Sequence, residues 1–302
     1  MRVIPEGSAR AIALETGEVD LVWGVDPTDC SNIEANSDVK LLSQPSSSIE
    51  YLGMNMTKEH FKDQKVRQAI NYAIDKQALV DTIVEGRGTV ANSYINNTIP
   101  GWTDEVEAYP YDPAKAKEYY EKALEECGLT SLTLTLQYNE TSANNKAASE
   151  FLHKSLPEVF GDSFTLELMA GSTSVLNSYI KGWKEGDPNS FELQWRGWNT
   201  STPAPWNGLK VYSSMYSNKN EPYYNDEFDA LWEKANYDIE AKLDPAYRMD
   251  LTRQMEKIVL DEVAACPVYE APSYNLISSK IHLVCDEYIP GYGFGYILST
   301  KD

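Results

Sequence analysis

A run of aromatic and small polar side chains between residues 196 and 206 offers the richest binding chemistry in this chain of 302 residues. Tryptophan supplies a flat apolar face, and the amide and hydroxyl groups beside it can form hydrogen bonds. The run therefore suits a ligand with apolar faces and polar edges. We predict that the ligand is contacted by Trp198, Asn199, Ser201 and Trp206. Each tryptophan could instead pack against the protein itself.

Arg196 alternates onto the same face as Trp198 in a strand pattern, so it could meet an anionic group of the ligand or lie on the surface. The sequence holds no Gly-x-Ser-x-Gly, His-Glu-x-x-His or phosphate-loop motif. Adjacent carboxylates such as Glu125-Glu126 lie on or beside predicted helices with charged faces, where solvation explains them. We therefore predict a binding protein and no enzyme, with a secreted sugar-active enzyme that uses two carboxylates as the alternative.

Metal and cofactor sites have no support in the sequence. The three histidines are scattered, at positions 60, 153 and 282, and the four cysteines lie far apart without a Cys-x-x-Cys pair, at positions 30, 127, 266 and 285. Four free thiols are favoured over a bridge between Cys266 and Cys285, because cysteine is often a small buried apolar residue. We predict no cofactor.

The charge balance limits the partners of this protein. Acidic residues outnumber basic ones 46 to 26, for a formal net charge of −20. Nucleic acids and anionic lipids bind through basic patches, so neither is an expected partner. No apolar run approaches the ~20 residues of a membrane-spanning helix. We expect a monomer.

The elements that must position the binding residues begin with residues 49–100. A short apolar run at 51–55 predicts a strand, and Asp63 is placed to cap the helix that follows. Apolar residues then recur at helical spacing from Val66 to Ile83, which predicts one long helix that ends before Gly86. Further along, alternating strands near 132–138, 164–168 and 191–198 are separated by helical segments, and this order predicts an α/β fold.

The same stretch resembles a known family. The sequence Tyr-Leu-x-Met-Asn at 51–55, Phe-Lys-Asp at 61–63, the run from Val66 to Asp75, and Gly86 are similar to the extracellular solute-binding proteins of family 5, the peptide/nickel group that serves ABC transporters. The resemblance implies an α/β fold of the periplasmic-binding-protein type II-like class. It further implies a remnant of a first lobe at residues 1–49, a second, nearly complete lobe at 50–270 and a return to the first lobe at 271–302.

The resemblance also bears on the site. The family carries an exposed loop near its cleft where Tyr94 lies here, and its return crossing matches the strand that contains Tyr269, so both are ligand candidates. In peptide-binding members a Gly-Trp pair precedes an Asp that holds the α-ammonium group of the peptide. Matching Gly197-Trp198 to that pair places Ser201 at the Asp position. A hydroxyl bonds an ammonium more weakly than a carboxylate does. A peptide held by another carboxylate and a neutral solute such as an oligosaccharide therefore both stay open.

The function that the resemblance implies is capture of oligopeptide-like solutes outside the cytoplasm and their delivery to ABC permease subunits. Capture would occur by closure of two lobes on hinges near Glu50 and Ala271. Family members carry a long amino-terminal region that this sequence lacks, so we expect a carboxy-terminal fragment of an extracytoplasmic protein, periplasmic or lipid-anchored.

Overall fold

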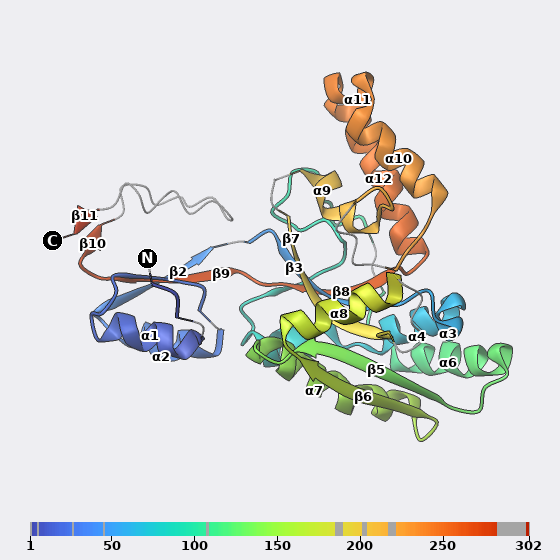
Figure 1. The fold of residues 1–302 in the computed structure, drawn as a ribbon, viewed down its shortest axis with the longest axis horizontal. Coiled ribbons are helices and arrows are strands. Elements are labelled where there is room, and N and C mark those ends of the chain that lie inside the picture. Colours follow the sequence, from blue (N-terminus) through green and yellow to red (C-terminus); the bar gives the residue numbers. More distant parts are fainter. Residues whose placement is uncertain are drawn as a thin grey trace.

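Two β-sheets of unequal size are joined by two strand crossings in the computed structural model of this protein (Figure 1). It describes residues 2–4, 6–25, 27–44, 46–106, 109–184, 190–200, 204–216, 222–282 and 300–301.

The larger sheet has six strands in the order β4-β8-β3-β7-β5-β6. β5 is parallel to β6 and to β7, and the other pairs are antiparallel. Its strands are β3 (Ser48–Met54), β4 (Thr89–Val90), β5 (Leu132–Asn139), β6 (Phe164–Gly171), β7 (Leu193–Asn199) and β8 (Ala265–Glu270).

Two separate hydrophobic cores lie on the two faces of this sheet. Successive strand residues face opposite sides, and in β3 Leu52 and Met54 join one core while Ile49 and Tyr51 join the other. The first core packs against α4 (Gln64–Ala73), α5 (Lys76–Ile83), α6 (Pro113–Cys127) and α7 (Ala143–Phe160).

The second core lies under the loop at residues 91–99 and a projecting group of helices (Figure 1). These helices are α9 (Pro205–Leu209), the 3₁₀ turn η1 (Lys210–Tyr212), α10 (Asp226–Tyr237), α11 (Ile239–Leu243) and α12 (Pro245–Asp261). Two further helices, α3 (Glu59–Lys62) and α8 (Thr173–Lys184), precede α4 and follow β6.

The smaller sheet has the strand order β1-β9-β2 and packs on two helices through a core of its own. Its elements are β1 (Leu21–Trp23), β2 (Val39–Gln44), β9 (Ser273–Ser278), α1 (Gly7–Glu15) and α2 (Pro27–Glu34). A separate antiparallel pair comprises β10 (Ile281–His282) and β11 (Thr300–Lys301).

The helical stretch after Asp63 differs from the prediction in one respect. Asp63 caps α4, because its side chain accepts a hydrogen bond from the backbone N–H of Lys65 at 2.8 Å. The predicted single helix to Ile83 is wrong, however. Ile74 is extended, and Asp75 starts a new helix by accepting from the N–H of Ala78 at 2.9 Å. A second capping carboxylate thus breaks the helix although the apolar spacing continues across the break.

Two strand crossings connect the sheets. The chain leaves β2 at Gln44 and enters β3 at Ser48, and it leaves β8 at Glu270 and enters β9 at Ser273. The hydroxyl of Ser46 donates to the carbonyl of Ala271 at 2.6 Å and so links the two crossings. Both crossings lie within a few residues of the predicted lobe boundaries, and the division into lobes stays a prediction.

Asn55, at the end of β3, is expected to stabilise the larger sheet through a fully buried amide. Its Nδ2 donates to the carbonyl of Phe191 at 2.7 Å, and its Oδ1 accepts from the backbone and hydroxyl of Thr57. Asn55→Ala leaves the buried carbonyl of Phe191 without this donor, so the free energy of unfolding should fall by about 1–3 kcal/mol in urea denaturation. The exposed Asn92→Ala is the control and should change it little; an equal loss in both variants would contradict this role.

Candidate functional site

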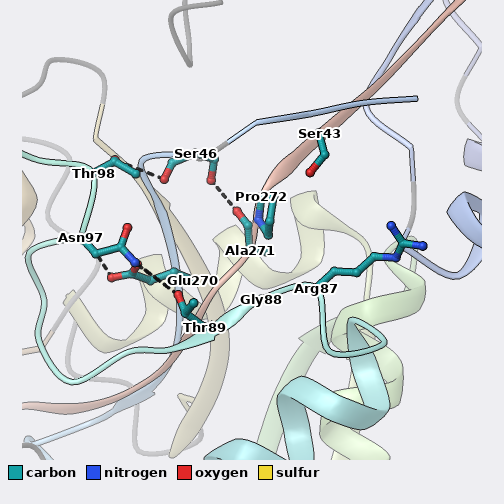
Figure 2. Close-up of a pocket in the computed structure, with 10 residues that line it drawn as sticks. All are labelled: Ser43, Ser46, Arg87, Gly88, Thr89, Asn97, Thr98, Glu270, Ala271 and Pro272. Carbon is teal, nitrogen blue, oxygen red and sulfur yellow. Dashed lines mark hydrogen bonds between the residues drawn. The ribbon is translucent and has the colours of Figure 1, made fainter. Parts of the chain in front are cut away.

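An open cavity of about 250 Å³ lies where the two crossings meet the larger sheet (Figure 2). Residues from both crossings, from β4 and from the loop at 91–99 surround it. The described residues that line it are Ser43, Ser46, Arg87, Gly88, Thr89, Asn97, Thr98, Glu270, Ala271 and Pro272.

Glu270 is the buried carboxylate of this cavity, with 6% of its surface exposed. The backbone N–H of Asn97 donates to its Oε1 at 2.9 Å, and the Thr89 hydroxyl lies 3.5 Å from its Oε2. The Asn97 amide in turn donates to the Thr89 hydroxyl at 3.3 Å. Burial raises the pKa of Glu270 to about 7, against the smaller lowering effect of the two hydrogen bonds.

Arg87 also lines the cavity, but its charged end turns away from Glu270 (Figure 2). Its guanidinium donates to both carboxylate oxygens of Glu34, at 3.1 and 2.8 Å. These bonds raise the pKa of Arg87 and lower that of Glu34. Because Glu34 belongs to α2 and Arg87 follows α5, this pair ties the smaller sheet's layer to the larger one.

An aromatic cluster lies on the other side of the 91–99 loop. The space among its side chains is only about 10 Å³, enclosed by Ile49, Tyr51, Tyr94, Trp198, Gly208, Val211 and Tyr212. Lys210 lies over the ring of Trp198, with its Nζ 5.1 Å from the ring centre, and over Tyr216 at 5.0 Å. The Trp198 Nε1 is buried and has no hydrogen-bond partner in the described part of the chain. Lys210 thus covers one face of the Trp198 ring, whereas the indole N–H has no hydrogen-bond partner among the described residues.

Tyr94 and Tyr269 are both buried, at 5% and 1% exposure. The Tyr94 hydroxyl donates to the carbonyl of Ala265 at 2.6 Å and accepts from its N–H at 3.0 Å, which fixes the loop to β8. Tyr269 packs near Trp195, with ring centres 6.2 Å apart, and burial raises its pKa. In this conformation each tyrosine serves packing within the lobe.

Arg196 and Asn199 lie on β7 at the end next to the first crossing. Arg196 donates to Gln194 at 2.8 Å, and Asn199 accepts from the Ser47 hydroxyl and donates to that of Ser48, both at 3.1 Å. Asn199 therefore fastens β7 to the crossing itself. Ser201 lies outside the described residues.

Trp206 lies apart from the crossing cavity, on α9. The guanidinium carbon of Arg248, from α12, stands 3.4 Å from the centre of its ring. This stacking contact occupies one face of the indole. The structure thus groups Tyr94 with Trp198 and places Asn199 nearby at the crossing, whereas Trp206 belongs to a different contact.

Glu50, whose side chain is partly buried, is another carboxyl-bearing residue near the crossings. It pairs with Gly197 on one side and Tyr269 on the other, inside β3. Its Oε2 accepts from the Trp195 indole at 3.1 Å, and burial raises its pKa to about 8. A side chain at Gly197 would meet its Oε1 at 2.5 Å, so the Glu50 carboxyl group would have to shift. The change of sheet comes before Glu50, between Gln44 and Ser48.

Sequence reasoning did not find Glu270, Thr89 or Asn97. The signal available was an acidic residue in the otherwise apolar run from Ala265 to Ala271. Its partners are 173 or more positions away in the sequence, so no local pattern identifies them.

Other site classes receive no support from the described residues. Within them no cluster of three or more His, Cys, Asp or Glu side chains could hold a metal ion. Cys30, Cys127 and Cys266 are free thiols, and Cys285 lies outside the described ranges. None of the helices in the described ranges combines the length and apolar character of a transmembrane segment.

Comparison with known proteins gives the family. Residues 1–220 match the family described as "Bacterial extracellular solute-binding proteins, family 5 Middle". Heme-binding protein A of Haemophilus influenzae is 27% identical over 281 residues, which cover 92% of this chain and 49% of the relative. Glutathione-binding protein GsiB of Escherichia coli is 29% identical over 279 residues, with 88% and 51% covered. The chain spans about half the length of these curated relatives.

Among solved structures, the periplasmic binding protein DppA from Helicobacter pylori in complex with the peptide STSA is similar in fold. It superposes with a TM-score of 0.82 at 23% identity, over 99% of this chain and 56% of that one. The predicted α/β class of periplasmic-binding-protein type is thereby confirmed. This chain belongs to the family 5 extracellular solute-binding proteins.

The raised pKa of Glu270 predicts a pH-dependent stability. The folded protein holds this proton more tightly than the unfolded chain, so the free energy of unfolding should fall as pH rises from about 4.5 to about 7. Glu270 alone contributes a slope of up to about 1.4 kcal/mol per pH unit in that window. Urea denaturation across the window should show a shallower slope for Glu270→Gln. The exposed Glu121→Gln is the control, and an unchanged slope in Glu270→Gln would contradict the assignment.

Proposed function

We propose that this chain forms the ligand-holding lobe and interlobe crossings of an extracytoplasmic solute-binding protein that captures oligopeptide-like solutes for an ABC importer. The observation that carries the proposal is the open cavity at the strand crossings of a family 5 chain, with hydroxyl, amide and carboxylate groups on its walls. Such groups match the backbone and termini of a short peptide.

Capture by lobe closure explains why the cavity lies at the crossings. A ligand shifts a two-state equilibrium only as far as it binds one state better than the other, so it must contact both lobes in the closed form. A cavity lined by both crossings meets this condition, because its walls move relative to one another when the lobes close. The short segments at 46–47 and 271–272 are the proposed hinges.

The other properties follow from this function. We propose that the protein acts as a monomer without catalytic activity, outside the cytoplasmic membrane or anchored to it by a lipid, and delivers its ligand to permease subunits. The names of the relatives range from heme to glutathione, so the family label alone leaves the solute open. An oligosaccharide would stack on the tryptophan rings. Lys210 and Arg248 already lie over the rings of Trp198 and Trp206, which counts against that alternative.

Native mass spectrometry of the protein isolated from its own cells without refolding tests the proposal. The expected result is a bound mass that fragments as a peptide. Thr98→Trp, which places an indole at the wall of the cavity, should lose that mass, because Thr98 is an exposed lining residue. Thr165→Trp makes the same exchange on an exposed position of β6 and should keep it. A bound hexose oligomer, or retention of the peptide in Thr98→Trp, would contradict the proposal.

A further inference from the structure

Glu270 is a buried carboxylate whose charge has no cationic partner among the described residues. It is 6% exposed, and its hydrogen-bond donors are the backbone of Asn97 and the Thr89 hydroxyl, both neutral. Burying an ionised carboxylate is costly unless a cation and hydrogen bonds compensate it. The two donors hold the carboxylate in place but leave its charge uncompensated.

Arg87, the cationic residue that lines the cavity, is already paired with another carboxylate. Of the ten residues that line the cavity, Glu270 and Arg87 are the charged ones. The guanidinium of Arg87 turns away from Glu270 (Figure 2). It donates to both carboxylate oxygens of Glu34. Its charge is therefore paired with the smaller sheet's layer, and burial raises the pKa of Glu270, which has no cation among the lining residues to offset it.

The shape and lining of the cavity suit a compact cation. Its volume of about 250 Å³ holds an ammonium group with several atoms of its stem, given roughly 30 Å³ for each water-sized unit. Thr89, whose hydroxyl lies beside the carboxylate, and Ser46 and Thr98 elsewhere on the cavity wall are further residues with oxygen atoms. An ammonium group carries three donors and no acceptor, so a carboxylate with neighbouring hydroxyl oxygens satisfies it.

We propose that this cavity binds a primary ammonium group of the captured solute, with Glu270 as its counter-ion and with Thr89 and Asn97 holding the carboxylate in place. The inference rests on the proposed capture of peptide-like solutes, and it names the group by which such a solute is held. Two sources share this chemistry, the α-amino terminus of a peptide and the side chain of a lysine.

Isothermal titration calorimetry on the protein expressed from its complete gene tests the proposal with three probes. Tetra-alanine carries an α-ammonium group, N-acetyl-tetra-alanine carries none, and N-acetyl-Ala-Lys-Ala-Ala carries one on its side chain. The wild-type protein should bind at least one ammonium-bearing probe about tenfold or more tightly than N-acetyl-tetra-alanine, because hydrogen bonds to a charged group are the stronger class. Which of the two gains affinity identifies the source of the ammonium group.

Glu270→Gln should abolish this preference while it still accepts the hydrogen bond from Asn97. The matched control is Glu50→Gln, which makes the same exchange at a carboxyl group on the paired strand β3. Glu50 pairs with Tyr269, so Glu270 faces the opposite side of the sheet, and Glu50 contacts Trp195 instead of the cavity. Glu50→Gln should therefore keep the preference.

Proton release gives a second readout that packing alone would not produce. A bound ammonium group favours ionised Glu270, so binding at pH 6.5 should release protons. The observed enthalpy of the wild-type protein should then depend on the ionisation enthalpy of the buffer, and that of Glu270→Gln should depend on it less.

The outcomes separate this site from the proposed function. Peptide binding without a preference for an ammonium group, or a preference that survives in Glu270→Gln, would overturn the site and leave peptide capture standing. Failure of every peptide to bind the wild-type protein would overturn peptide capture and this assignment together.

Discussion

The double pairing of β3 is the constraint on which the rest of the structure depends. β3 is hydrogen-bonded to β7 along its whole length and to β8 on its other edge, and it contributes side chains to the cores on both faces. A shift of one residue would move each buried side chain to the wrong face, so its register is strongly specified. The first crossing, which enters β3 at Ser48, therefore starts from a fixed point.

Both groups of candidate binding residues are held against this strand. Asn96 donates to the carbonyl of Ser48 at 2.9 Å and so lays the 91–99 loop across the beginning of β3. The cavity with Glu270 lies on the β8 side of this loop, and the cluster with Trp198 lies on the β7 side. The adjacent crossings at 46–47 and 271–272 are the proposed hinges, and a movement of the smaller sheet about them would shift the cavity walls that the crossings supply. The Arg87–Glu34 pair is the contact that such a movement would strain.

Local patterns predicted much of this fold, and long-range contacts account for what they missed. Alternation located β5 and β6, and a capping residue located α4, because these signals lie within a few positions of one another. The helix break at Asp75 was not predicted, because the apolar spacing continues through it. Trp198 was predicted as a ligand surface, yet Lys210 lies over its ring. Glu270 was not predicted as a site residue, because its partners Asn97 and Thr89 are distant in the sequence and meet it only in the fold.

Hydrogen–deuterium exchange with and without saturating tetra-alanine, on the protein from its complete gene, tests most directly whether the crossings hold the ligand. The account predicts slower exchange on peptide binding at residues 46–48, 96–98 and 270–271, because the ligand contacts the cavity walls and closure restrains both crossings. Slower exchange confined to the projecting helices α10–α12, with the crossings unchanged, would contradict it.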